Sequence, residues 1–361
     1  YAYIYPFLQL LVFVPIQWAR TDQDRDTVAY YQAAERIDRG ESVYDPRPPR
    51  GPHVVEAWYY LYPPFLAAAV SLATPMPFIA FARLWLLLLL AAFWFYAVCL
   101  CKLARGRVTF HGTLVAGAFL GLTPGIMQAL NIGQADVLVW PMIAAALAFP
   151  AVRGAGFAAA ALAKVHGIWP LAAAFARERM RVLGSAAAVV AIAVAIGTVA
   201  LGPRGLVRSS TEWLRFVAPS LGQGQFEPGD PSLELRLPFD LGRVELPILV
   251  PTNLSVSFAP IAIARRAGWW EYRGGELPAP MRIYLAVIAI AAPIAAAWLF
   301  RRRTRPMHYA LIVCAATVFA PIFRLTNVPL LLIPIAIALG ERHRAVAAQP
   351  VKTARSAHVH V

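Results

Sequence analysis

Asp26 lies in an acidic stretch that directly follows the first apolar segment, which ends at Trp18. A Trp58–Phe65 segment follows, in which three tyrosines precede Pro63 and Pro64. An acid after an apolar segment, followed by an aromatic-Pro-Pro run, indicates a site for chemistry at a bilayer surface. An aspartate that begins a helix often only caps it, so a capping role for Asp26 is the equal alternative.

Lys164 is one of only three lysines among 33 basic residues, and it alone lies within an apolar stretch. An ionisable residue inside a membrane is costly and is a functional candidate by default. The lysine could hold a phosphate as a compact point charge, with His166 assisting. The alternative is a side chain that reaches along its apolar stem to the membrane interface.

Polar side chains at three further places are also candidates for substrate contacts. Asn131 and Gln134 flank Gly133 in a turn and suit hydrogen bonding to hydroxyl groups, although a plain polar turn explains them equally. Asn253 and Ser255 are predicted to lie on a short apolar helix in a long loop that mixes aromatic and basic residues. Arg324 could face the same cavity as Asp26, or could only be the end of a loop.

The composition predicts an all-α polytopic membrane protein. The chain is 59% hydrophobic and 14% charged, with a mean hydropathy of +0.58. Its three cysteines lie in apolar segments and indicate neither a disulfide framework nor a metal cluster. The chain begins at Tyr1, so we expect an incomplete first span, and we recognise no signal peptide. The expected spans are 1–18, 80–101, 109–128, 134–151, 183–202, 280–300, 307–323 and 326–340.

Three other segments are expected to be helical without crossing the membrane. The stretch 154–176 has arginines at both ends and is predicted to fold back near Lys164 as a hairpin of two half-helices. Residues 61–77 are short and proline-rich, which favours an interfacial or re-entrant helix. Residues 26–39 carry apolar positions at helical spacing and predict an amphipathic helix on the outer surface.

The distribution of basic residues predicts the orientation in the membrane. It also explains the net charge of +14, so a nucleic-acid-binding function is not needed to account for it. By the positive-inside rule, the basic clusters face the cytoplasm, and nearly all acids fall in two external loops, about 19–79 and 203–279. We expect one domain over 1–341 and a disordered basic tail over 342–361. The clusters are Lys102 to Arg107, Arg153, Arg177 to Arg181, Arg301 to Arg305, and Arg342 with Arg344.

The chain has neither a P-loop nor a Rossmann glycine pattern. An enzyme that works on the outer face of a membrane has no access to cytosolic nucleotide donors. A transferase of this type would therefore take its donor from a lipid.

In this order, these features resemble glycosyltransferase family 87, whose members are GT-C-fold mannosyltransferases that use polyprenyl-phosphate mannose. The likeness runs over about 15–340, although the 321–327 segment differs from the Pro-Ile-Ser-Trp-like element usual there. The residues that carry it are Asp26 with the Tyr30–Ala34 run, Gly40 to Tyr44, Tyr62-Pro63-Pro64, Gly133-Gln134, Lys164, and Asn253 with Ser255.

The resemblance implies an inverting transfer of a hexose, with mannose preferred, at the extracytoplasmic side of the plasma membrane. Asp26, or Asp24 in its place, would be the general base, and Lys164 with Arg324 would stabilise the leaving phosphate. No cofactor is implied, and a divalent metal is not required. Substrate contacts would come from Tyr30, Tyr62, Gln134, Asn131, Asn253 and Ser255.

Several alternatives stay open on the sequence. The same chemistry could move arabinose or glucose instead of mannose. A lipid-linked sugar flippase would also have broken helices and an intramembrane lysine. A non-catalytic subunit of a cell-envelope complex is a third possibility. The acceptor could be a glycolipid, a lipoglycan or a glycoprotein.

Overall fold

The computed structural model describes residues 3–20, 25–44, 60, 62–214, 279–320 and 325–348, and every regular element within these ranges is helical. Asp24, Asn253, Ser255, Arg324 and most of the second predicted loop lie outside them. The helices of the first half are α1 Tyr5–Leu8, η1 Gln9–Phe13, α2 Val14–Arg20, α3 Arg25–Asp38, α4 Pro64–Ser71, α5 Phe78–Arg105, α6 Phe110–Gly121, α7 Pro124–Asn131 and α8 Asp136–Ala148. Those of the second half are η3 Pro150–Val152, α9 Arg153–Ala163, η4 Val165–Gly167, α10 Ile168–Glu178, α11 Met180–Glu212, α14 Ala279–Leu299, α15 Arg305–Val318, η7 Leu325–Leu331 and α16 Leu332–Ala347.

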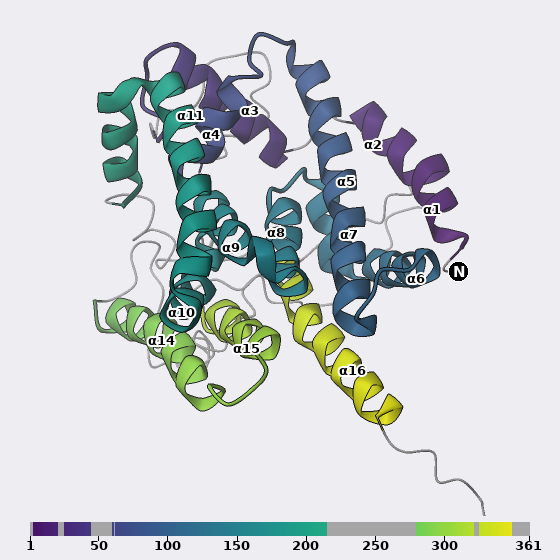
Figure 1. Cartoon of the computed structure of the whole chain (residues 1–361). Coiled ribbons are helices and arrows are strands. Elements are labelled where there is room, and N and C mark those ends of the chain that lie inside the picture. The colour runs from purple at the N-terminus through teal and green to yellow at the C-terminus, as the bar shows by residue number, and fades with distance from the viewer. Residues whose placement is uncertain are drawn as a thin grey trace, which may run out of the picture.

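Helix α8 lies at the centre and packs between α5 and α9. Helix α11 covers α9, and α16 packs along α5. Helices α3 and α4 pack together at one end of the molecule, whereas the α10–α11 turn, the α14–α15 connection and the end of α16 lie at the other end (Figure 1). The basic clusters therefore gather at the end opposite α3, as the positive-inside pattern predicts.

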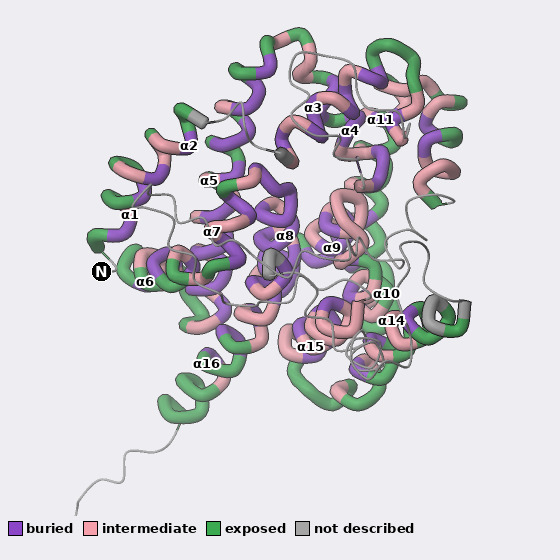
Figure 2. The backbone as a smooth tube through the Cα atoms, turned by 180° about the vertical axis from the view of Figure 1, so that it is seen from behind, coloured by how far each residue is buried: buried purple, intermediate pink, exposed green. Residues whose placement is uncertain are grey.

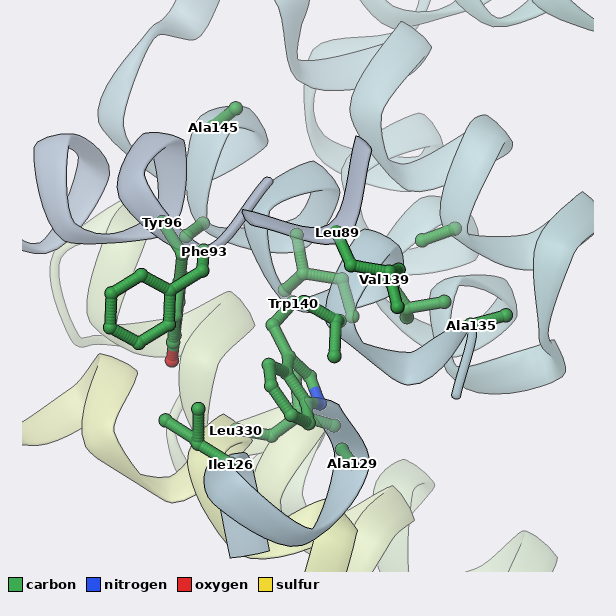
Figure 3. Packing of buried hydrophobic residues seen from close by; sticks show 14 of the residues in the cluster. Leu89, Phe93, Tyr96, Ile126, Ala129, Ala135, Val139, Trp140, Ala145 and Leu330 are labelled. Carbon is green, nitrogen blue, oxygen red and sulfur yellow. The ribbon is translucent and has the colours of Figure 1, made fainter. Parts of the chain in front are cut away.

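The core surrounds the tilted start of α8. Trp140 is almost fully buried, and Figure 3 shows its indole among side chains of α7, α8 and η7. Tyr96 of α5 lies beside it, with the ring centroids 6.2 Å apart, and donates a 2.6 Å hydrogen bond to the Pro329 carbonyl. This bond joins α5 to η7 across a separation of 233 residues.

Two of the described helices, α5 and α11, are long and apolar enough to cross a membrane. The number rises to four if each of two bent pairs, α6 with α7 and α8 with η3 and α9, counts as one span. The predicted span 109–128 is not straight, because the chain bends by 79° between Gly121 and Pro124. The eight-span arrangement therefore stays a prediction. The structure confirms that the regular elements of the described residues are helical and that some are long enough to cross a membrane.

The outward faces of these helices are apolar. Figure 2 shows exposed residues along the outer sides of the molecule, and many are large hydrophobic side chains. Such extended exposed apolar surface is uncommon in soluble monomers and suits contact with lipid. Examples are Leu84, Leu87, Leu88 and Phe95 on α5, Ile192 and Val199 on α11, and Ile283, Ile290 and Ile294 on α14.

The predicted 26–39 helix is confirmed as α3, but its surroundings differ from the prediction. Its residues Tyr30, Tyr31, Ala34 and Ile37 are buried, so the apolar face packs on protein. The α4 helix, within the 61–77 segment, provides much of this contact and is too short to cross a membrane.

The predicted hairpin is present. Lys164 has extended backbone angles and ends α9, after which η4 turns the chain into α10. The open ends of the hairpin meet, since the Arg153 guanidinium donates a 2.5 Å hydrogen bond to the Glu178 carboxylate. The apex thus carries Lys164, and the arginines mark the base.

Helices α11 and α16 continue into segments that were expected to be loop and tail. Gly202 has φ +69° and ψ 161°, which kinks the chain, and Pro203 then starts a further helical stretch to Glu212, inside the expected 203–279 loop. Helix α16 continues to Ala347, into the expected tail, because residues 341–347 include no proline or glycine to end it.

Candidate functional site

The turn between α7 and α8 anchors the candidate site. Gly133 adopts φ +71°, and a Cβ there would collide with the Thr27 hydroxyl of α3. Two hydrogen bonds hold the turn: the Trp85 indole donates to the Gly133 carbonyl at 2.8 Å, and the Asp26 amide donates to the Ile132 carbonyl at 3.2 Å. The start of helix α3 is thereby placed directly against the turn that precedes α8.

Replacing Gly133 with alanine should destabilise the protein by about 1–3 kcal/mol, because the side chain must adopt left-handed backbone angles and displace Thr27. Thermal unfolding of the detergent-purified protein measures the effect. Gly184→Ala is the matched control, since it lies in helical α11 with open space at its Cβ. Equal melting temperatures for the two variants would contradict the close approach of α3.

Tyr30 links Asp26 to the start of α8. Its hydroxyl accepts a 2.9 Å hydrogen bond from the Ala135 amide and makes a long, 3.5 Å contact as donor to the Asp26 carboxylate. Burial raises the pKa of Tyr30 well above its usual range, and neighbouring Tyr62 and the Asp26 carboxylate raise it further. The phenol therefore stays neutral and retains its proton beside the carboxylate.

Tyr62 and Gln134 continue the polar row. The Tyr62 ring packs edge-on against the Tyr30 ring, with the centroids 5.3 Å apart, and its hydroxyl interacts with Tyr30 and Gln134. Gln134 is buried, and its side-chain oxygen Oε1 has no hydrogen-bond partner among the described residues. An unsatisfied buried amide oxygen costs free energy, so it is available to accept a bond from a hydroxyl that enters the site.

Lys164 and Asp136 form an ion pair at the inner end of this row. The Lys164 ammonium donates to both carboxylate oxygens of Asp136, at 2.6 and 2.7 Å. The Asp136 side chain is 2% exposed and that of Lys164 24% exposed. The ammonium also lies 5.7 Å from the centre of the Tyr62 ring. The one lysine in an apolar stretch is thus placed by a carboxylate and an aromatic face, with its remaining surface open.

His166 lies two residues beyond Lys164, in η4. Its ring nitrogen Nδ1 is buried and has no hydrogen-bond partner among the described residues. Like the oxygen of Gln134, this nitrogen is a polar atom that the described protein atoms leave unsatisfied.

The structure brings Asp26, Tyr30, Tyr62, Gln134 and Lys164 into one row of contacts, with His166 beside its inner end. Asn131 is engaged elsewhere, since its side-chain oxygen accepts a 2.7 Å hydrogen bond from Gln17 of α2. The catalytic and binding roles of all these residues stay predictions, as do those of the four that lie outside the described ranges.

Sequence reasoning missed Asp136. A signal was present, because Asp136 is a lone acid at the start of an apolar segment and Lys164 is a lone lysine within one. Charged groups in a membrane usually pair with one another, so each could have been assigned to the other.

The model of glycosyltransferase family 87 matches residues 60–325. The chain belongs to glycosyltransferase family 87. The resemblance based on the motifs is thereby confirmed, and as a family 87 glycosyltransferase the protein uses a sugar donor and an acceptor. Tyr62, Gln134, Asp136 and Lys164 lie within the matched segment, whereas Asp26 and Tyr30 precede it. In the same comparisons, no curated protein and no solved structure matches the chain.

Proposed function

We propose that this family 87 glycosyltransferase moves a hexose, with mannose the first choice, from a polyprenyl-phosphate donor to a lipid or glycan acceptor. Transfer would take place at the outer face of the plasma membrane with inversion at the anomeric carbon. The observation that carries the proposal is the polar row that begins at the Asp26 carboxylate and ends at the Lys164 ammonium.

The carboxylate end of the row suits the acceptor. Asp26 would remove the proton from an acceptor hydroxyl as that oxygen attacks the anomeric carbon. Tyr30 stays neutral, and its hydroxyl holds the carboxylate by a long contact. The unsatisfied oxygen of Gln134 would accept a hydrogen bond from a sugar hydroxyl.

The ammonium end of the row suits the donor. As the new bond forms, the bond between the anomeric carbon and the phosphate oxygen breaks, and its electron pair leaves with the polyprenyl phosphate. Lys164 has three N–H donors, of which Asp136 accepts two. The third would bind a phosphate oxygen and stabilise its developing charge. No step requires a metal ion.

The proposed outer-face location rests on the distribution of charge between the ends of the molecule. Helix α3 lies at one end, and the basic α10–α11 and α14–α15 connections lie at the other (Figure 1). Basic connections are typical of the cytoplasmic side, which would put Asp26 on the external side.

A cysteine-accessibility experiment tests this orientation. In intact cells, Arg39→Cys at the end of α3 should react with a membrane-impermeant maleimide, whereas Arg303→Cys in the α14–α15 connection should react only after lysis. The unsubstituted protein measures the background from Cys99, Cys101 and Cys314. Labelling of Arg303→Cys in intact cells would show that the orientation is the reverse of the one proposed.

Sugar transfer by the purified protein in liposomes tests the function itself. The donor is polyprenyl-phosphate mannose, the acceptors are a mixed lipid extract, and the anomeric configuration of the product is determined. We expect a mannosylated product of inverted configuration. If only arabinose or glucose were transferred, mannose would be the wrong sugar for this enzyme. Lipid movement without transfer would support the flippase alternative.

A further inference from the structure

A second polar site lies at the basic end of the molecule, away from the Asp26 row (Figure 1). It is a pocket of about 610 Å³ formed where η3 leads into α9, where α11 begins and where α15 begins. Three arginines and one glutamate provide its charged lining: Arg153, Glu178, Arg181 and Arg305. The volume is in the range of pockets that bind small ligands.

Glu178 already has hydrogen-bond partners within the protein. The Glu178 oxygen Oε1 accepts hydrogen bonds from the buried Arg153 guanidinium at 2.5 Å and from the Tyr309 hydroxyl at 2.8 Å. Its other oxygen is 3.9 Å from the Arg305 guanidinium, too far for a hydrogen bond. One of the three arginines is therefore neutralised directly.

The other two arginines have little to neutralise them. The Arg305 side chain is 54% exposed and has only that distant contact, and the exposed Arg181 has no ion-pair partner among the described residues. Both lie in the first turn of a helix, where the helix dipole adds positive potential. An anion that entered the pocket would meet two guanidinium groups that donate no hydrogen bond to a carboxylate of the described residues.

The turn that places these groups is strained. Arg179 has φ 42° and ψ −113°, and it is the only described residue other than glycine with a positive φ. The turn directs Glu178, on one side of it, and Arg181, on the other, into the same pocket. Strained backbone of this kind persists where the surroundings hold it and clusters at binding sites.

Large apolar side chains are exposed beside the lining residues. Met180, which precedes Arg181, is 77% exposed, and Val152 and Leu183 are also exposed. A free phosphate compound gains nothing from such surface, whereas a phospholipid brings hydrocarbon and phosphate together. Basic pockets between helices on the cytoplasmic side are a recognised form of lipid headgroup site.

We propose that this pocket binds the phosphate of an anionic phospholipid through Arg181 and Arg305, with the lipid chains along the apolar surface around Met180. The site is separate from the proposed sugar-transfer site, and its occupancy can be measured without turnover. It would fix the position of the α10–α11 and α14–α15 turns at the membrane surface.

Native mass spectrometry of the delipidated full chain with phosphatidylglycerol tests the proposal. We expect the Arg181→Gln/Arg305→Gln variant to bind this lipid roughly 25-fold more weakly, since each arginine near an anionic surface contributes about fivefold. Arg342→Gln/Arg344→Gln on α16 is the matched control, because it removes the same charge from exposed positions at the same end, and it should change affinity less than twofold. Arg181→Lys/Arg305→Lys should keep most of the affinity.

Three results would overturn the proposal. Phosphatidylcholine of the same chain length could bind as well as phosphatidylglycerol, or the control pair could lose as much affinity as the pocket pair. Glycerol 1-phosphate could bind as tightly as the lipid, which would make the pocket a site for a soluble phosphate ester. Melting temperatures verify that each variant is folded, and the two pocket arginines are exposed enough to be replaced without disturbing the core.

Discussion

Replacing Asp26 with asparagine is expected to lower sugar transfer by about 10²–10⁴-fold while the protein stays folded and binds its donor. Asparagine has the same shape and keeps an oxygen to accept the Tyr30 contact, but it cannot take a proton from the acceptor hydroxyl. The measurement is initial transfer rate in liposomes, together with donor affinity and melting temperature.

Asp38→Asn is the matched control for this variant. Asp38 is exposed at the far end of the same helix, so the identical change there should leave transfer within about twofold, as is usual for surface substitutions. Wild-type turnover by Asp26→Asn would refute the base assignment. It would make Asp26 a residue of the first helical turn and nothing more.

Replacing Lys164 with glutamine should have two separate effects. Donor affinity and turnover should both fall, since the ammonium is the proposed contact of the leaving phosphate. Stability should fall as well, because the nearly inaccessible Asp136 carboxylate loses the partner that holds both its oxygens. Removing one partner of a buried pair typically costs about 3–5 kcal/mol, and we expect the lower end here because Lys164 is partly exposed.

The double variant Lys164→Gln with Asp136→Asn separates these effects. Two neutral amides can hydrogen-bond to each other, so the melting temperature should recover most of the loss. Turnover should not recover, because the cation is still missing. If restored stability also restored donor binding and turnover, Lys164 would be a structural partner of Asp136 without a role at the phosphate.

The pairing changes how an intramembrane lysine is understood here. From the sequence, Lys164 is a lone cation that a phosphate would neutralise. In the structure, Asp136 neutralises much of that charge and fixes the direction of the ammonium. A phosphate would therefore meet an oriented hydrogen-bond donor with a reduced net charge, and Asp136 acts as a positioning residue in the proposed mechanism.

The local secondary structure of the chain follows from its sequence. Helical periodicity predicted α3, and the arginines at both ends of 154–176 predicted the hairpin that breaks at Lys164. The proline-rich 61–77 segment was predicted to be too short to span, and α4 ends at Ser71. These features depend only on residues that are close in the sequence. Periodicity, prolines and charge placement are therefore enough to predict them.

The sequence also determined the family, since the spacing of short motifs indicated family 87 and the match over 60–325 confirmed it. Motif spacing could not show which motifs touch. That depended on Gly133, whose missing side chain lets α3 approach the turn before α8 and places Tyr30 between Asp26 and Ala135.

Only the tertiary structure decided how the charged groups are partnered. Lys164 and Asp136 are 28 residues apart, and Arg153 meets Glu178 across 25. The composition alone indicates that the few charged side chains within the apolar segments must be paired, because an isolated charge in a medium of low dielectric constant is too costly. Which acid takes which base depends on how the hairpins fold against α8, and that packing is a property of the whole chain.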